Sequence, residues 1–263
     1  VVTDADDAPD PADFGVTAAN TVTFAWGDSP SGQTGSIFFR VQVNEGIAAG
    51  TNVANVASIV YSATDGGPLL DATQSSTGGI TIAAEPIITL PVTAESNTGQ
   101  PGDSLWYPIT VTNGGNVTDI LDIETSSSLG FESIIWLDAN GDGIPGNDGD
   151  YILTDTNSDG QVDTGNLPAG TSANIIVVTI VTPGTADLAV DNTTVTITSV
   201  TDPTVTGTVT LTTTTHAPVL VVTKSVSPTG PQPPGTVLTY SVTMTNTGNG
   251  SATGLQLVDI VPT

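Results

Sequence analysis

The stretch PGDSLWYPITVTNGGN, residues 101–116, decides the fold because apolar side chains occupy every second position in its centre. Leu105, Tyr107, Ile109 and Val111 therefore share one face of an extended strand, while the residues between them face the other way. The Asn-Gly-Gly-Asn that follows is rich in residues that form tight turns. Alternation of this length, ended by a turn, predicts a half-buried antiparallel strand.

The same alternation recurs in SIFFRVQV (36–43), TTVTITS (193–199) and TVLTYSVTMT (236–245). Thr, Val, Ile and Gly dominate the chain, and β-branched side chains favour strands over helices. Short strands separated by Gly, Pro, Asn and Asp turns are typical of β-sandwiches. The sequence therefore predicts an all-β chain built of immunoglobulin-like β-sandwiches.

Positive charge is almost absent, since Arg40 and Lys224 stand against 27 acidic residues and the formal net charge is −25. Without cations to neutralise phosphates, nucleic acid is excluded as a partner, and anionic membrane surfaces are disfavoured. The chain has no cysteine, so we expect no disulfides. No apolar run approaches the ~20 residues of a membrane span. A chain this acidic attracts cations instead.

An internal repeat organises the chain. PGDSLWYPITVTNGGN matches PGTVLTYSVTMTNTGN (234–249), so that Tyr107 aligns with Tyr240. LPAGTSANIIVVTIVTPG (167–184) resembles SPSGQTGSIFFRVQVNEG (29–46), so that Pro168 aligns with Pro30. The C-terminal part of the chain thus matches only the first half of the repeat, and the N-terminal part matches only its second half.

These matches predict three segments. Residues 86–216 form a complete β-sandwich, residues 217–263 are the first half of a second one, and residues 1–85 are its second half. The lengths of the two halves add up to nearly the length of the middle segment, so together they are long enough for a whole domain. The sequence therefore predicts one complete domain and two complementary half-domains.

The segment TKSVSPTGPQPPGTVLTYSVTMTNTGNGSATGLQLVDIVP (223–262) resembles a repeat domain of bacterial and archaeal surface proteins, the domain of unknown function numbered eleven. Its Lys-Ser-Val strand, Pro-Gly turn, Thr-Asn-Thr-Gly-Asn turn and Asp-x-x-Pro ending match that family. Met244 and Leu257 replace valines of the motif, and both changes are apolar. The middle segment resembles a variant with an acidic insertion. The resemblance implies an immunoglobulin-like fold at the surface of a bacterium or archaeon, and no activity.

Half a sandwich leaves its core face in water and its strand edges unpaired, and each large apolar side chain left exposed forgoes ~1.5–3 kcal/mol. The two ends of one chain could close a permuted domain, or the chain could be one unit of a longer covalent array. Alternatively, the C-terminal half of one subunit docks as donor onto the N-terminal acceptor half of the next. This third arrangement is heterologous, adds strands across the interface and builds a filament. It is favoured here, so the expected partner is the chain itself.

The expected interface residues are the apolar positions of the two half-domain faces. In the donor half they are Leu238, Tyr240, Val242, Met244, Leu255 and Leu257; in the acceptor half they are Val22, Phe24, Phe39, Val41, Ala57 and Ile59.

Two Asp-rich loops lie back to back in DANGDGIPGNDGDYILTDTNSDGQVD (138–163), and each fits the calcium-loop pattern D-x-[DN]-x-[DN]-G. Oxygen ligands two residues apart can surround one cation, and the glycine permits the sharp turn. The expected ligands of structural Ca²⁺ are Asp138, Asn140, Asp142, Ile144, Asp148 and Asp150 in the first loop, and Asp155, Asn157, Asp159, Gln161 and Asp163 in the second. Neither loop has a Glu at position twelve and both follow strand patterns, so they resemble, in sequence only, the loops of dockerins and thrombospondin type 3 repeats rather than EF-hands.

Other features give weaker signals. The acidic cluster TDADDAPDPADFG (3–15) lacks the loop register, and His216 has no partner His or Cys, so neither predicts a site. No nucleophile or tuned carboxylate pair is framed by a motif, and we expect no enzymatic activity. Asn-x-Ser/Thr sequons at Asn116, Asn192 and Asn249 are candidate glycan sites.

The sequence thus predicts an extracellular, calcium-stabilised structural subunit of a surface fibre. The alternative is an adhesin or glycan-binding repeat, which would require exposed aromatic residues such as Trp26, Trp106 or Trp136.

Overall fold

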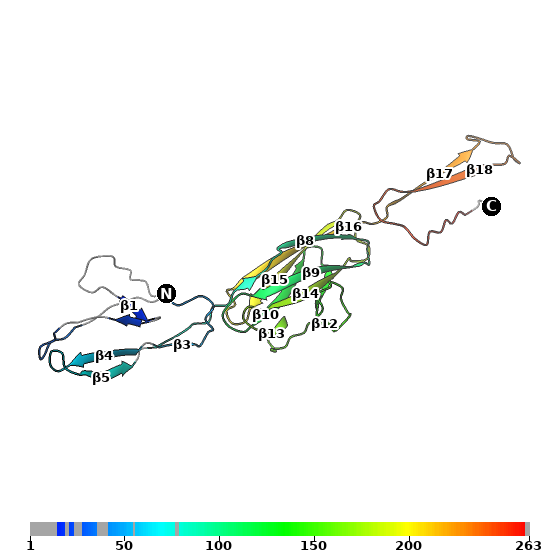
Figure 1. Ribbon diagram of the computed structural model, residues 1–263. Helices are drawn as coiled ribbons and strands as arrows, with labels where there is room; N and C mark the ends of the chain where they lie inside the picture. Colours follow the sequence, from blue (N-terminus) through cyan, green and yellow to red (C-terminus); the bar gives the residue numbers. More distant parts are fainter. Residues whose placement is uncertain are drawn as a thin grey trace. The chain divides into compact units, whose positions relative to one another are not determined.

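Figure 1 shows the computed structural model of the chain. The structure describes residues 15–18, 21–23, 28–35, 42–54, 56–76 and 79–260. All regular structure in this part of the chain is strand, which confirms the all-β fold class. No helix in the described ranges is long and apolar enough to cross a membrane.

The chain divides into two compact units, Val1–Ile47 and Ala48–Thr263. In the first unit, β1 (Gly15–Ala18) pairs antiparallel with β2 (Thr21–Thr23). The predicted interface residues Phe24, Phe39 and Val41 lie outside the described residues, and Val22 lies in β2.

Two five-stranded sheets lie between residues 88 and 215 of the second unit (Figure 1). In one sheet the strand order is β13 (Val162–Leu167), β10 (Asp119–Ser127), β15 (Val190–Ser199), β16 (Thr206–Thr215) and β8 (Ala94–Gly99). In the other it is β12 (Tyr151–Ile152), β11 (Glu132–Leu137), β14 (Ser172–Ile180), β9 (Ser104–Asn113) and β7 (Ile88–Thr89). All neighbours are antiparallel except β16 and β8, which are parallel.

The core lies between these sheets and is filled largely by alternate residues of the long strands, as the alternation predicted. Tyr107, Ile109 and Val111 of β9 are buried, and so are Val195 and Ile197 of β15. The hydroxyl of Tyr107 lies 2.7 Å from Oγ1 of Thr213, which is fully buried on β16. This bond ties the two sheets together and satisfies polar groups that burial would otherwise leave unpaired.

Two further ladders lie outside the five-stranded sheets. In the first, β3 (Asn52–Val53) and β4 (Val56–Ser62) run against β6 (Ile80–Thr81) and β5 (Leu69–Ser76). In the second, β17 (Leu220–Ser227) pairs with β18 (Thr239–Asn246). The first comprises two two-stranded sheets, β3–β6 and β4–β5, and the second is a single two-stranded sheet; residues 251–260 contain no strand.

The repeat of the sequence is also visible as equivalent hydrogen bonds. Asn113 donates through Nδ2 to the carbonyl of Val117 at 2.8 Å, and Asn246 donates to that of Gly250 at 2.7 Å. Leu220 is paired with Asn246 as Ile88 is with Asn113, so β17 and β18 are equivalent to β7 and β9.

Equivalent bonds also relate the first ladder to β15 and β16. Gly50 N donates to Ile82 O at 2.9 Å, and Leu188 N donates to Thr215 O at 2.8 Å. The return bonds, from Ile82 N to Thr51 O and from Thr215 N to Ala189 O, are 2.9 and 2.8 Å long. Because the sequence match that aligns Pro30 with Pro168 also aligns Gly50 with Leu188, β3–β4 occupies the place of β15 in the repeat.

Replacing Tyr107 with Phe tests the bond between the sheets. It leaves the Thr213 hydroxyl buried without this partner, and we expect the free energy of unfolding to fall by about 1 kcal/mol. Tyr151→Phe is the matched control, because Tyr151 is 53% exposed, and it should change stability little. Urea denaturation measures both; equal effects would contradict the assigned role of Tyr107.

Candidate functional site

The two acidic loops have the same internal hydrogen bonds. In the first, Oδ1 of Asp138 accepts from the backbone N–H groups of Gly141 and Asp142, and Oδ2 accepts from that of Gly143. Oδ1 of Asp142 accepts from Ile144 N at 2.8 Å. This network turns the loop tightly and gathers its oxygens toward one point.

The second loop repeats the pattern from Asp155 onward. Asp155 accepts from the N–H groups of Ser158, Asp159 and Gly160, and Asp159 accepts from Gln161 N at 2.9 Å. The shared bonds show that the motif D-x-N-x-D-G folds in the same way at both places.

Three carboxylates of the first loop could hold a metal ion. Asp138, Asp142 and Asp150 each have an oxygen within 4.8 Å of the others. Asp138 is buried, whereas Asp142 is exposed and Asp150 is half-buried. Hydrogen bonds from Ile144, Asn147 and Asn140 keep the pKa of Asp142 below its ordinary value, so this group is ionised at neutral pH. A cluster of carboxylate oxygens suits a hard divalent cation.

The remaining predicted ligands of the first loop lie around this group. Asn140 donates from Nδ2 to Asp142, so it belongs to the network that orients the carboxylates. Asp148 is exposed with a φ of 35°, and it is not among the three grouped carboxylates. The backbone of Ile144 contacts Asp142 through its N–H.

The first loop also covers the outer face of the sheet that contains β14. An added Cβ at Gly143 would lie 3.6 Å from Pro108, and one at Gly146 would lie 3.6 Å from Trp136. The Asp138 N–H donates to Asn174 O. Ile176, whose neighbours in the sheet are Pro108 and Trp136, is fully buried. The loop therefore buries apolar side chains on the face opposite the core, and order in the loop matters for stability.

Asp122 of β10 lies beside the second loop, and the loop motif gives no sign of it. It is the register partner of Asp163, and its Oδ1 is buried without a hydrogen-bond partner. The pKa of Asp122 is raised to about 6. Burial is the largest cause, and repulsion from Asp159, Asp163 and Asp155 adds to it. A cation bound at the second loop would relieve this repulsion, so the donor set fits a metal ion.

Asp163 itself is a structural carboxylate. It is fully buried and accepts hydrogen bonds from Thr156 N, Thr156 Oγ1 and Gly165 N at 2.6 Å each. Burial raises its pKa, but these hydrogen bonds outweigh that effect and leave the pKa below its ordinary value. Asp163 thus anchors the second loop to β13; its predicted role as a metal ligand stays a prediction, as does that of Asn157, which donates to Asp159.

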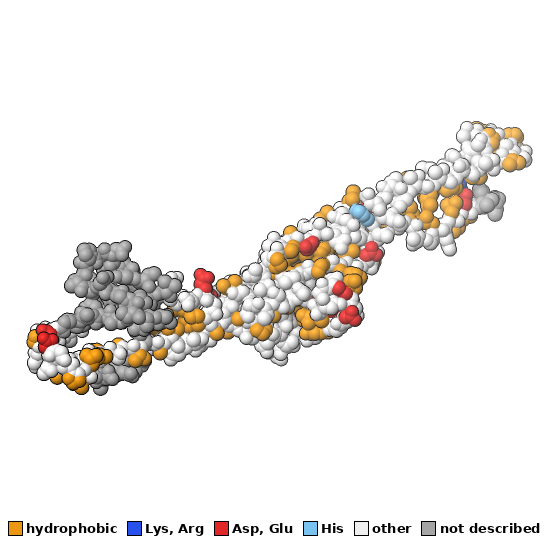
Figure 2. Space-filling model, in the orientation of Figure 1, with side chains coloured by type: hydrophobic (Ala, Val, Ile, Leu, Met, Phe, Trp, Pro, Cys, Tyr) orange, Lys and Arg blue, Asp and Glu red, His pale blue; other side chains and the backbone are white. Residues whose placement is uncertain are grey.

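The predicted donor residues lie on the exposed faces of the C-terminal segment. Tyr240 and Met244 are 43% and 46% exposed on β18, and Leu257 is 68% exposed. Leu238 and Leu255 are also exposed, and Val242 is half-buried. Figure 2 shows hydrophobic side chains on the surface of this hairpin.

The first ladder also leaves its predicted acceptor residues exposed. Ile59 is 64% exposed and Ala57 is exposed, although the equivalent Ile197 and Val195 are fully buried in the sandwich. Figure 2 shows hydrophobic side chains over β4 and β5 as well. Among the described residues, β4 pairs only with β5 and β18 pairs only with β17. Each ladder therefore has the composition of a core face without the opposite layer that would cover it.

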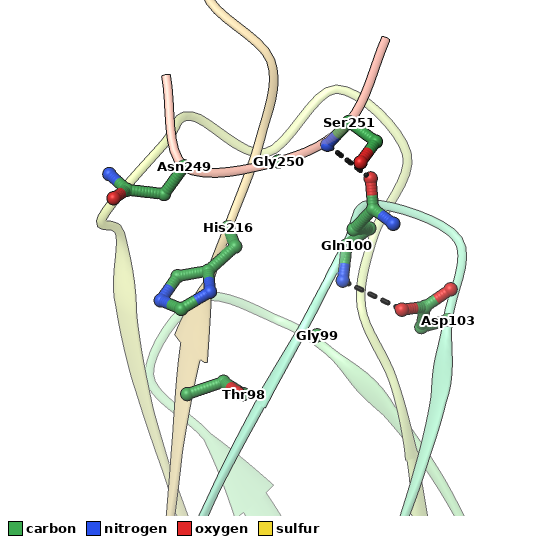
Figure 3. Close-up of a pocket in the computed structure, with 8 residues that line it drawn as sticks. All are labelled: Thr98, Gly99, Gln100, Asp103, His216, Asn249, Gly250 and Ser251. Atoms are coloured by element: carbon green, nitrogen blue, oxygen red, sulfur yellow. Dashed lines mark hydrogen bonds between the residues drawn. The ribbon is translucent and has the colours of Figure 1, made fainter. Parts of the chain in front are cut away.

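A polar pocket of about 260 Å³ lies where the C-terminal hairpin leaves the sandwich (Figure 3). Ser251 N donates to Oε1 of Gln100 at 3.0 Å across it, as Figure 3 shows. Asp187 accepts from Ala217 N and from Nδ2 of Asn249, both at 2.8 Å. These bonds join the base of the hairpin to the sandwich, so the pocket is best described as a hydrogen-bonded connection.

The side-chain amides of the three sequon asparagines make different hydrogen bonds. Nδ2 of Asn116 donates to Ala83 O, and Nδ2 of Asn249 donates to Asp187. Asn192 is exposed on β15, and its amide oxygen accepts from Thr212. Glycan attachment stays a prediction, and this geometry favours Asn192 over the other two.

The tryptophans that a glycan-binding platform would use differ in their exposure, although Trp106 and Trp136 share the outer face of one sheet. Trp106 is 44% exposed on β9, while Trp136 is half-buried beneath the first acidic loop. Trp26 lies outside the described residues. Nothing here specifically favours the binding-module alternative.

Comparisons with known proteins complete the description. No family model and no curated protein matches the chain. It is similar to the PapD-like domain 7 of human CEP192, with 12% identity over 49% of this chain and 84% of that one, and a TM-score of 0.30. The secreted serine protease VesC of Vibrio cholerae matches with 16% identity over 51% and 24%, at a TM-score of 0.30. The class 5 fimbriae chaperone CfaA matches with 15% identity over 62% and 67%, at a TM-score of 0.26. Likenesses this slight carry no argument about function.

Replacing Asp122 with Asn tests the crowding at the second loop. Because its pKa is about 6 in the folded chain against an ordinary 3.8, the folded state binds this proton more tightly than the unfolded chain does. The ionised group therefore destabilises the fold increasingly as pH rises from about 4 to about 6. In chelator at pH 7.5 we expect Asp122→Asn to raise the free energy of unfolding by about 1 kcal/mol.

At pH 3.5 the same substitution should give no gain, because the carboxyl is protonated in both states. Glu132→Gln, at an exposed position, is the control and should change little at either pH. A stability loss for Asp122→Asn in chelator at pH 7.5 would show that its charge is not a liability. Urea denaturation at the two pH values provides the measurement.

Proposed function

We propose that this chain is the subunit of an extracellular surface filament, with a structural rather than a catalytic role. One observation carries the proposal: the chain holds two complementary halves of its own repeat, each with an apolar face that no other described residues cover. β17, β18 and residues 251–260 correspond to the first half of the sandwich, while β3–β6 corresponds to β15 and β16 of the second half. The halves of two copies supply what each lacks.

Charge favours this docking. Of the 27 acidic residues only Asp259 lies in residues 217–263, and Lys224 lies 2.6 Å from it. The donor half is therefore neutral, although the chain as a whole carries −25. A neutral donor can approach a strongly acidic acceptor without the repulsion that would keep two like-charged surfaces apart.

Burial supplies the free energy of docking. Leu238, Tyr240 and Leu257 are 42%, 43% and 68% exposed, and Ile59 is 64% exposed. Fully burying one such side chain gains ~1.5–3 kcal/mol. The docked strands would also satisfy backbone groups along the open edges. Because the donor and acceptor are different surfaces of the same chain, the association is head to tail and continues into a fibre.

Calcium would stabilise the subunit through its acidic loops. Asp138, Asp142 and Asp150 would hold one ion, and Asp155 and Asp159 would contribute to a second near Asp122. Bound calcium supplies positive charge that offsets carboxylate repulsion and so orders both loops. Sites with few protein ligands are weak, which suits an extracellular location where calcium is millimolar.

The docking face is tested by Tyr240→Asp, which places a charge on the donor face. We expect it to abolish fibres in electron micrographs, because docking would bury a charged carboxylate in an apolar face, and the nearby Lys224 is already paired with Asp259. Thr243→Asp adds the same charge on the other face of β18, and its fibres should persist. Circular dichroism shows that both variants stay folded; fibres from Tyr240→Asp equal to those of the parent chain would sink the docking model.

Calcium is tested by thermal unfolding of the chain in chelator and in millimolar calcium. At ten times its dissociation constant, one bound ion adds roughly 1.4 kcal/mol to the free energy of unfolding. Asp142→Asn should remove the part of this gain due to the first loop, whereas Asp148→Asn, also in that loop but outside the three grouped carboxylates, should retain it. An identical calcium response in both variants would contradict the assigned ligands.

A further inference from the structure

Residues 251–260 take the place of the third strand of the repeat in the donor half, and they form no strand in this structure for a definite reason. By position in the repeat they are equivalent to β10, which lies between β13 and β15 in the sandwich. The equivalent of β15 is β3–β4, at the other end of the sequence. These residues therefore have no ladder among the described residues, because their neighbour belongs to the acceptor half.

We infer that residues 253–260 of one copy pair antiparallel with the open edge of β4 in the next copy, with Leu257 opposite Ile59. This inference rests on the proposed filament and specifies which strands meet and in which register. The occupant of the β4 edge is thus a second copy of this chain, recognised by backbone pairing and by alternating apolar side chains.

The acceptor side of the register follows from β15. Val195 and Ile197 of β15 are fully buried, and the alignment of Gly50 with Leu188 makes Ala57 and Ile59 their equivalents. Pairing supports this numbering. The pairing shifts register at two places. One shift lies between the pairs Val53↔Ile80 and Val56↔Ser76, and the other between Ala57↔Ser75 and Ile59↔Ala72. At both places the strand with one more residue is on the β5–β6 side. The shifts therefore leave the numbering of β3 and β4 unchanged relative to β15.

The donor side follows from β10. Leu121 and Ile123 are buried core residues, and Ile123 is the register partner of Ile197. The equivalent apolar alternation in the donor segment is Leu255 and Leu257. This alignment requires one extra residue after Gly250, in the stretch where Gly254 has a φ of 66°. A one-residue slip would instead turn both leucines away from the core.

An ion pair fixes the position of residues 251–260 relative to β17. Lys224 Nζ lies 2.6 Å from Oδ1 of Asp259 and 4.7 Å from the centre of the Tyr240 ring. β17 is equivalent to β7, and 251–260 is equivalent to β10, which belong to opposite sheets of the sandwich. The Lys224–Asp259 contact therefore joins the two layers of the donor half and keeps the segment in the layer that β4 would join.

The register can be tested by disulfide cross-linking, since the chain has no cysteine of its own. The double variant Ile59→Cys/Leu257→Cys is assembled, oxidised and run on a denaturing gel without reductant. We expect a ladder of covalent multimers. Ile59→Cys/Leu255→Cys is the matched control, on the same face but two residues out of register, where Cβ separations of about 7–8 Å exceed disulfide reach. Its yield should be lower by at least about fivefold.

A second double variant, Tyr61→Cys/Leu255→Cys, belongs to the same register and should also give a ladder of covalent multimers. It keeps the register testable if the first double variant fails to assemble. Electron microscopy of the same samples separates the two levels of the proposal. Fibres that cross-link through the control pair would overturn the register but not the filament. Fibres that cross-link through neither Ile59→Cys/Leu257→Cys nor Tyr61→Cys/Leu255→Cys would have the same meaning.

Absence of fibres from the parent chain would overturn the filament itself, and the inference with it. A cross-linked species that remains a single chain would show that the two halves close within one molecule. Mixing the single variants Ile59→Cys and Leu257→Cys should give covalent dimers only, because each chain then carries one reactive end.

Discussion

The open edge of β4 is the constraint on which the rest of the molecule depends. Backbone N–H and C=O groups along a strand edge need partners, and an apolar sheet face needs a covering layer. The sandwich between residues 88 and 215 meets both needs within itself, because β10 pairs with β15 and β14 pairs with β9. The same repeat, divided between the two ends of the chain, meets neither need among the described residues.

The distribution of charge fits this arrangement. The acids are concentrated away from residues 217–263, so the strong net charge would not oppose the proposed docking. The first acidic loop has a second task, because it covers Ile176 on the outer face of its sheet. Order in that loop therefore supports the sandwich as well as its surface, and a cation bound there would add to this support.

The sequence predicts the strands well because period-2 alternation is strong wherever one face is buried, as in residues 104–113. It also predicts the turn of both acidic loops, because D-x-N-x-D-G specifies Asp138 and Asp155 as acceptors of three N–H groups each. The sequence does not predict that Asp122 lies at the second loop, since only the pairing of β10 with β13 brings it there. The burial of Ile176 could be predicted from the continuous apolar run IIVV at 175–178, because such a run is typical of a strand covered on both faces.

The central claim is that two chains contribute to each composite sandwich, and cryo-electron microscopy of the assembled 263-residue chain tests it most directly. The account predicts a fibre whose repeating unit contains one whole sandwich from a single chain and one sandwich shared by neighbouring chains, with residues 251–260 beside β4. Discrete monomers in which β4 pairs with the chain's own C-terminal segment would contradict it.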